Sequence, residues 1–316
     1  MAFLVWASRG RDFNLTGMLV GTLEAATPIA LGALSGIWCE RSAVINIAIE
    51  GMMLSGAFSG VVVGSATGSQ FIGLLGGMLT GLLLGALLAV LAIRFKVNQI
   101  IAGTAINIFS TGLTSYLSAR WLAENQHLNS IENFPRAVVP VVSRIPVLGP
   151  VLFQNNLPIY LMLVLVVVTH IILFSTRWGL RSRAVGEHPL AADTLGVNVI
   201  WTRYVNVLIG GLIAGLGGAY FTLGSVGRFD EEMTAGRGFI GLAAMIFGRW
   251  TPAGALGSSL IFGFSQSLQM KLSLLNVPIP SNILLMAPYL ATIIVLAGVV
   301  GRAVAPAADG VPYEKQ

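Results

Sequence analysis

The segment QFIGLLGGMLTGLLLGALLAVLAI, residues 70–93, contains no charged side chain and no proline. A helix needs about 20 apolar residues to cross the hydrocarbon core of a bilayer, so this segment predicts a transmembrane helix. Its glycines at 73, 77, 81 and 85 recur every four residues, and an earlier set recurs at 56, 60, 64 and 68. Glycine stripes of this kind let helix backbones approach closely in lipid. We therefore expect the two stripes to pack neighbouring helices against each other.

Comparable apolar runs extend over most of the chain, at 17–37, 43–66, 70–93, 99–120, 157–175, 204–223, 239–250, 253–272 and 282–301. Run 239–250 is too short to span a bilayer by itself, so we expect it to form a half-helix or part of a broken one. These runs predict an all-α fold, a polytopic transmembrane bundle of roughly nine helices with discontinuous segments. They leave little sequence for a soluble domain, and residues 1–316 are expected to form one transmembrane domain.

The composition supports a membrane protein. Hydrophobic residues make up 55% of the chain and charged residues 10%, with a mean hydropathy of +0.82. A soluble domain would carry about 25% charged residues. The net charge of +5 comes from Lys and Arg residues that sit singly between apolar runs, so we expect no nucleic-acid partner. Placing Arg94 and Lys96 in the cytoplasm also places there the 177–203 loop and the C-terminal tail.

The sequence lacks the motifs of common catalytic and metal sites. It has no G-x-x-x-x-G-K-[ST] phosphate loop and no G-x-S-x-G elbow, and its three histidines are far apart without an HExxH pattern. Its single cysteine, Cys39, excludes a cysteine-based metal cage. We therefore expect no catalytic residue, no bound metal and no cofactor, and the chain is not expected to be an enzyme.

A carboxylate interrupts the apolar stretch CERSAVINIAIEGMMLSGA, residues 39–57. Glu50 would cost about 2.5–3.5 kcal/mol near the bilayer centre, so it needs partners. Free backbone N–H groups at a broken helix start would serve, and Gly51 permits such a break. Two roles remain open for Glu50: holding this segment to its neighbours, or lining the substrate path. The same question applies to Glu24, for which the structural role is favoured.

Another polar stretch, RSRAVGEHPLAADTLGVN, covers residues 181–198. Pro189 suits the first turn of a helix and Gly196 its end, so a two-turn helix is expected between them. Ala191 and Ala192 would allow a close fit into a groove on another protein. An ordinary surface helix between two spans would have the same residues.

Both stretches resemble the inner-membrane permease subunits of bacterial ABC importers, in the branch that moves nucleosides, simple sugars and branched-chain amino acids. Residues 39–57 are similar to the E-R-S-x-x-x-N-I-x-I-E-G-M-x-L-x-G-A string of the nucleoside and simple-sugar permeases, although Ala48 stands where that string usually has Gly. Residues 181–198 resemble the cytoplasmic coupling loop of the same branch. The resemblance extends over about residues 17–302.

The resemblance implies a multi-pass protein of the bacterial cytoplasmic (inner) membrane that works with other subunits. These are a separate ABC ATPase, an extracytoplasmic substrate-binding protein, and a second permease that is either a copy of this chain or a relative. The coupling loop, at about 177–203, would dock the ATPase through Gly186, Glu187, Pro189, Ala191, Ala192, Asp193 and Gly196.

Polar residues at helical spacing mark a candidate path for the substrate. They lie on runs 99–120 and 253–272, where helix–helix hydrogen bonding would also explain them. Neither of the two stripes contains Lys or Arg, which argues against an anionic substrate; the stripes are Thr104, Asn107, Thr111 and Ser115 on the first run, and Ser258, Phe262, Ser265 and Gln269 on the second. Gly236–Gly241 gives a second helix break, and paired interruptions are typical of transport sites. The candidate residues are Asn46, Glu50, Thr104, Asn107, Thr111, Phe262, Gln266 and Gln269.

The leading interpretation is the translocation subunit of an ABC importer for a neutral polar solute, most simply a nucleoside or simple sugar. The alternative is an ion-coupled secondary transporter that uses Glu24 and Glu50, and a third is a membrane-embedded assembly factor. The 181–198 loop distinguishes these classes, because a secondary transporter needs no helix for docking an ATPase.

Overall fold

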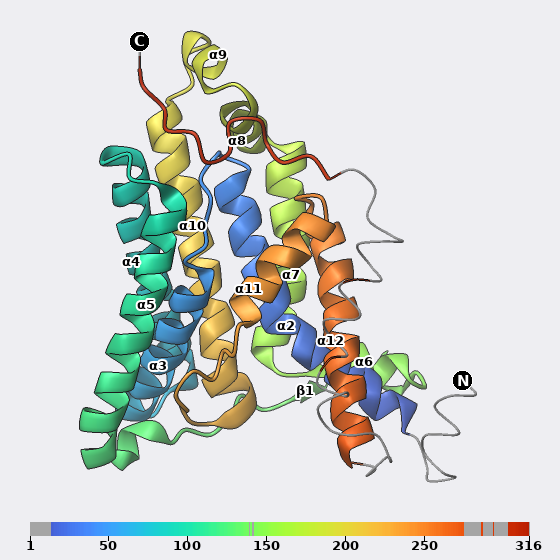
Figure 1. Cartoon of the computed structure of the whole chain (residues 1–316). Helices are drawn as coiled ribbons and strands as arrows, with labels where there is room; N and C mark the ends of the chain where they lie inside the picture. The colour runs from blue at the N-terminus through green and yellow to red at the C-terminus, as the bar shows by residue number, and fades with distance from the viewer. Residues whose placement is uncertain are drawn as a thin grey trace.

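The computed structural model describes residues 14–138, 140, 142–274, 286, 293 and 303–315. This part of the chain is mostly helical (Figure 1). Its helices are α2 (Leu15–Glu40), α3 (Ile49–Thr67), α4 (Gln70–Ala89), α5 (Gln99–Leu117), α6 (Leu148–Phe153), α7 (Leu157–Ser175), α8 (Arg177–Glu187), α9 (Pro189–Thr194), α10 (Val199–Ala219), α11 (Arg237–Phe247) and α12 (Pro252–Leu274). Strands β1 (Ala137–Val138) and β2 (Gln154–Asn155) pair antiparallel.

The described residues also include short π-helical and 3-10 segments. Three π-helical segments, Val90–Arg94, Ser118–Leu122 and Tyr220–Val226, extend α4, α5 and α10, and two 3-10 turns cover Gln126–Asn129 and Val142–Arg144. The π-helical turns lengthen α4, α5 and α10 to 25, 24 and 28 residues, which is enough to span a bilayer.

Six helices in the described residues are long and apolar enough to cross a membrane. They are Leu15–Glu40, Ile49–Thr67, Gln70–Arg94, Gln99–Leu122, Leu157–Ser175 and Val199–Val226. The predicted all-α membrane bundle is confirmed, whereas the count of roughly nine is not. Run 239–250 forms the short helix α11, and run 253–272 forms α12, which does not count among the six. Run 282–301 lies outside the described residues, apart from the isolated residues 286 and 293.

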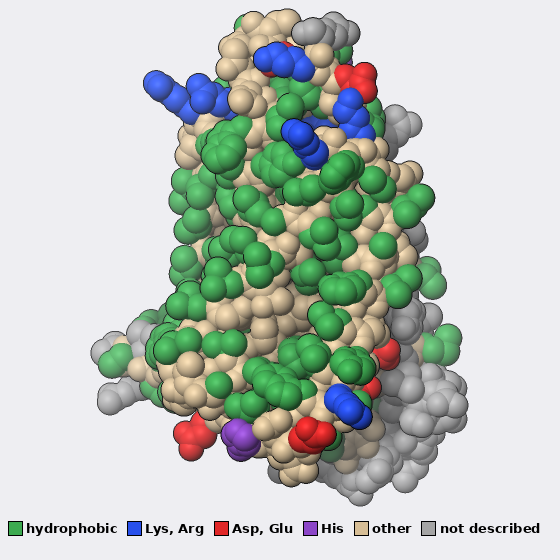
Figure 2. Space-filling model, turned by 90° about the vertical axis from the view of Figure 1, so that its left-hand side faces the viewer, with side chains coloured by type: hydrophobic (Ala, Val, Ile, Leu, Met, Phe, Trp, Pro, Cys, Tyr) green, Lys and Arg blue, Asp and Glu red, His purple; other side chains and the backbone are tan. Residues whose placement is uncertain are grey.

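The bundle has two polar ends separated by an apolar band. One end carries α8 and α9, and we call it the α9 end; α2 begins at the opposite end (Figure 1). Figure 2 shows charged side chains of both signs at the two ends of the molecule, with Lys and Arg more frequent at one end and Asp and Glu at the other, and hydrophobic side chains between them. This pattern matches a protein that crosses a bilayer with both ends in water.

Glycine allows the central helices to touch backbone to backbone. A Cβ on Gly77 would lie 2.7 Å from the carbonyl oxygen of Gly56, and one on Gly73 would lie 2.5 Å from that of Gly60. The stripes on α3 and α4 therefore face each other, as predicted. The structure adds a third stripe on α10, because a Cβ on Gly211 would lie 2.5 Å from the carbonyl oxygen of Gly81. Any side chain at these positions would force the helices apart.

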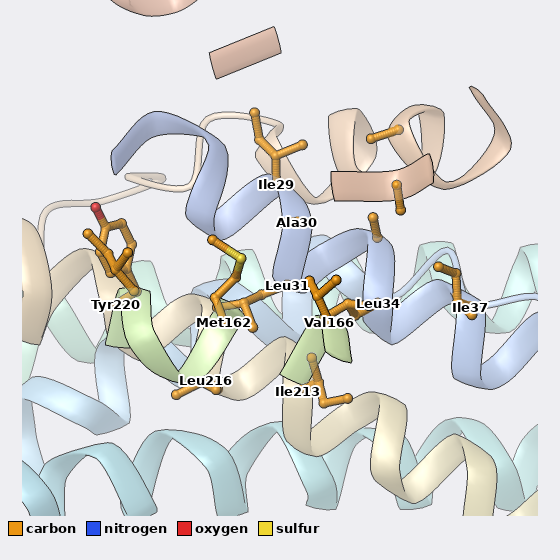
Figure 3. Close-up of a cluster of buried hydrophobic side chains, with 14 of the residues drawn as sticks. Ile29, Ala30, Leu31, Leu34, Ile37, Met162, Val166, Ile213, Leu216 and Tyr220 are labelled. Atoms are coloured by element: carbon orange, nitrogen blue, oxygen red, sulfur yellow. The ribbon is translucent and has the colours of Figure 1, made fainter. Parts of the chain in front are cut away.

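Helix α2 runs through the middle of the core. Its apolar residues pack against α7 and α10 in one cluster, which includes Ile29, Leu34, Met162, Val166 and Ile213 (Figure 3). Helices α11 and α12 pack on another side of α2. Close-packed apolar contacts of this kind fix the position of α2 relative to its neighbours.

The predicted break in the 39–57 motif lies earlier than Gly51. Helix α2 ends at Glu40, residues 41–48 form no regular helix, and α3 begins at Ile49. Ala43 has φ of 65°, a backbone conformation that is uncommon for a residue with a side chain. This non-helical segment leads into α3, whose first residue, Ile49, is buried inside the protein.

Candidate functional site

Two broken helices meet at the Glu50 carboxylate. Glu50 lies in the first turn of α3, and α11 begins beside it at Arg237. The Oε1 atom accepts hydrogen bonds from the Thr234 hydroxyl at 2.6 Å and the Gly236 N–H at 2.8 Å, and Oε2 accepts one from the Gly238 N–H at 2.6 Å. The negative charge therefore faces the positive ends of two helices. This geometry favours the structural role for Glu50, since both oxygens bond to the protein.

Glycine makes the junction tight enough for these bonds. A Cβ on Gly238 would lie 2.7 Å from the Glu50 backbone nitrogen, and Gly236 has φ of 77°, which strains other residues. The predicted second break, Gly236–Gly241, is therefore present at its first residue. The two breaks lie against each other, in the arrangement expected of paired interruptions.

Asn107 holds the other side of the same break. Its Oδ1 accepts a hydrogen bond from the Gly51 N–H at 2.8 Å, and its Nδ2 donates to the Ile47 carbonyl at 2.8 Å. Asn46 is fully buried and donates weakly to the Ser35 hydroxyl and to the sulfur of Cys39. The structure thus brings Asn46, Glu50 and Asn107 together around residues 41–51.

The remaining candidate path residues are dispersed. Thr104 is exposed and bonds back to the Ile100 carbonyl of its own helix, and Thr111 is half-buried on the same helix. Phe262 is buried and stacks on Phe247, so its face is not available to a ligand. Gln266 lines a cavity between α2 and α12, whereas the half-buried Gln269 does not. Their role in transport stays a prediction.

The 181–198 motif forms two helices at the α9 end. Helix α9, Pro189–Thr194, has the expected proline at its start, and Gly196 follows it with φ of 81°. Ala192 is buried against Val185 of α8 and Val199 of α10, so it packs α9 against both helices. Gly186 is also buried, because a Cβ there would lie 2.5 Å from the Arg41 carbonyl oxygen. The packing of Ala192 and Gly186 therefore fixes the position of α9 relative to the bundle.

The outer face of α9 is open. Glu187, Ala191 and Gly196 are exposed, and Pro189 and Asp193 are half-buried. Leu195 is 85% exposed and Leu190 49% exposed, so apolar side chains project from the end of the protein. Exposed apolar residues with a polar rim are typical of a protein interface. Sequence reasoning did not select Leu190 and Leu195, although both lie inside the motif.

A C-terminal strap, residues 303–315, lies across the base of α8 and α9 (Figure 1). The Ala308 N–H donates to the Gly186 carbonyl at 2.9 Å, and the Ala307 N–H donates to the Glu187 carboxylate at 3.2 Å. Arg203, buried near the start of α10, donates to the Val311 carbonyl at 3.0 Å. The strap therefore ties the α8–α9 pair to a membrane-spanning helix.

Asp309 is the most deeply placed charge of the strap. Burial raises the pKa of its carboxyl to about 6, and a hydrogen bond with Glu40 and the positive charge of Arg203 oppose that rise. Glu40 is buried at the end of α2 and accepts a hydrogen bond from the Trp250 indole at 2.6 Å. Sequence reasoning missed this contact, because the two acids are 269 residues apart and carry no motif.

The described residues give this protein the features of a membrane transport subunit. They contain a multi-pass bundle, paired helix breaks inside it and an exposed apolar face at one end. Within this part of the chain, no group of three His, Cys, Asp or Glu residues comes together as a metal site would require.

Comparison with known proteins identifies the family. Residues 18–299 match the model of the "branched-chain amino acid transport system / permease component" family, and the chain belongs to that family. It is 42% identical to the guanosine ABC transporter permease protein NupQ of Bacillus subtilis, over 95% of this chain and 97% of NupQ. It is also 42% identical to the nucleoside ABC transporter permease protein NupC of Lactococcus lactis, over 94% and 96% of the two chains. A putative glucose ABC transporter permease protein, TsgC13 of Haloferax volcanii, is 36% identical over 84% of this chain and 80% of its own.

Proposed function

We propose that this chain is the translocation subunit of an ABC importer for nucleosides in the bacterial cytoplasmic membrane. The observation that carries this proposal is the match over nearly the whole chain to two relatives whose names specify guanosine and nucleosides. A simple sugar is the second candidate, because a relative named for glucose also aligns over most of the chain. Both solutes are neutral and polar, as the uncharged stripes led us to expect.

The α9 face would receive the ABC ATPase. It is apolar at Leu190 and Leu195, it stands clear of the bundle, and its base is held by the strap and by buried Ala192 and Gly186. Such a rigid projection can pass a movement of the ATPase to α10, against which α8 and α9 pack. The second permease and an extracytoplasmic substrate-binding protein complete the proposed importer.

The ion-coupled alternative gains nothing from this geometry. Glu50, one of the two carboxylates on which this alternative depends, uses both oxygens on Thr234, Gly236 and Gly238. A carboxylate that carries protons or sodium would need oxygens that are open to the path.

The substrate class is tested by competition. The complete importer would be expressed in a strain that lacks nucleoside uptake of its own, and entry of labelled guanosine would be measured. We expect unlabelled nucleosides in excess to suppress uptake, whereas glucose, ribose and leucine leave it unchanged. Suppression by glucose but not by nucleosides would replace the nucleoside proposal with the sugar one.

A further inference from the structure

A cavity of about 270 Å³ lies between the first half of α2, the π-helical end of α10 and α12. Charged and amide side chains line it together with apolar ones, namely Glu24, Tyr220, Asp230, Arg237, Gln266 and Met270. Its volume is close to the lower limit of small-molecule sites, about 300 Å³. Glu24 is the tenth residue of α2, or about 14 Å along the axis from its start at the end opposite α9. Glu24 thus lies within a helix long and apolar enough to cross a membrane, and ionisable groups in such helices mark functional sites.

Arg237 carries the positive charge of the cavity, and one of its nitrogens bonds to the cavity wall. The Arg237 guanidinium donates to the carbonyls of Met233 and Thr234, at 3.2 and 3.3 Å, and lies 5.3 Å from the centre of the Phe221 ring. The Tyr220 hydroxyl donates to the Glu24 backbone carbonyl at 3.0 Å. Arg237 Nη1 and the Tyr220 hydroxyl therefore bond to the protein itself, and the two carboxylates in the same cavity, Glu24 and Asp230, disfavour an anion there.

The hydrogen-bond acceptors that line the cavity have fewer partners within the described part of the chain. One oxygen of Glu24 takes the Arg136 guanidinium, and no described residue donates to the other. Asp230 meets Arg228 at 3.3 Å, and both of these side chains are more than half exposed. The Gln266 amide forms no hydrogen bond with the described part of the chain. Carboxylate oxygens suit the hydroxyl groups of a neutral solute. Met270, 66% exposed, adds a polarisable apolar surface.

We propose that this cavity is an outer substrate site for a nucleoside, in which Glu24 and Asp230 accept hydrogen bonds from the ribose hydroxyls. The base lies against Met233 and Met270, with its polar edge toward Gln266. This inference rests on the proposed function and adds to it the groups that recognise the sugar. Of the two glutamines on α12, Gln266 lines the cavity and Gln269 does not, which provides a matched pair for the test.

The test compares guanosine with 2′,3′-dideoxyguanosine, which lacks the 2′- and 3′-hydroxyls of the ribose and keeps the 5′-hydroxyl. Uptake of each is measured with the complete importer, and the variant rate is divided by the wild-type rate for the same compound, so that selection by the binding protein cancels. We expect Glu24→Gln to lower guanosine uptake about tenfold, because charge-assisted hydrogen bonds are lost. Its effect on the dideoxynucleoside should stay within about twofold.

Two controls separate recognition from structure. Arg136→Gln removes the ion pair but keeps the Glu24 carboxylate, and it should leave both uptake rates close to wild type. Gln266→Leu should lower uptake of both nucleosides, whereas Gln269→Leu, about one turn along the same helix, should not. Equal loss of the two compounds in Glu24→Gln, or the same loss in Arg136→Gln, would overturn the assignment. Absence of nucleoside uptake by the wild-type importer would instead refute the proposed function.

Discussion

Replacing Glu50 tests whether this carboxylate holds the two helix breaks together. In Glu50→Ala, the Thr234 hydroxyl and the N–H groups of Gly236 and Gly238 lose their acceptor. An unsatisfied buried donor costs about 1–3 kcal/mol, so the three together cost at least about 3 kcal/mol. That is a large fraction of the stability of a typical domain. We expect low membrane abundance and a lowered melting temperature in detergent.

Glu50→Gln should fall between Ala and wild type. All three partners of Glu50 are donors, so the Gln side chain can keep one oxygen for Thr234 and Gly236 but turns an N–H₂ group toward the Gly238 N–H. The loss of one charge-assisted bond costs about 1.5–3 kcal/mol. The matched control is Glu231→Gln. Glu231 is exposed and lies in the loop that also contains Thr234 and Gly236.

The assay is the melting temperature and membrane abundance of the three variants beside guanosine uptake. The account predicts that uptake per folded molecule stays near wild type in Glu50→Gln. Wild-type stability of Glu50→Ala would refute the reasoning. Abundant, stable Glu50→Gln protein without uptake would return Glu50 to the substrate path.

Three further changes test other parts of the structure. Leu195→Asp should abolish co-purification of the ATPase without lowering membrane abundance, whereas Ala192→Arg, placed in a buried position, should lower abundance itself; ATPase retention by Leu195→Asp would contradict the docking role. The strap should dock more tightly at about pH 5 than at about pH 8, because the raised pKa of Asp309 means that the docked state binds a proton more readily, and stability is lost as pH rises from about 4 to about 6. Asp309→Asn should reduce the pH dependence of hydrogen exchange in residues 303–315, where Glu40 is the other buried carboxyl in contact with Asp309, and an unchanged dependence would assign it to another group. Gly77→Leu should prevent α3 and α4 from closing, which would appear as a loss of folded protein extracted from membranes, whereas Gly112→Leu, in open space, should be tolerated.

The sequence predicted the spanning helices well, because the bilayer demands long apolar runs and the hydropathy of a run is a local property. It placed the first break only approximately. Residues 43–48 are as apolar as the helix that follows, and a non-helical segment buried in protein needs no polar sequence. The glycine stripes predicted the contact of α3 with α4, yet they could not show that α10 joins it, since that partner is distant in sequence.

Only part of the candidate site could be predicted, because some of its contacts join residues that are distant in the sequence. Glu50 and Asn107 stood out as polar residues in apolar runs, and the structure brings them to one break. Phe262 was a candidate for the substrate path, but in the structure its ring is buried and stacks on Phe247. The strap, with Asp309 against Glu40, depends on contacts between the two ends of the chain that no local pattern encodes.

The most direct test of the account is the energy source of transport. The chain would be reconstituted in vesicles with its ATPase, second permease and binding protein, and guanosine entry would be followed with and without ATP on the ATPase side. We predict uptake that requires ATP, persists when proton and sodium gradients are collapsed, and disappears when the ATPase is left out. Uptake by the chain alone, driven by an ion gradient, would contradict the central claim.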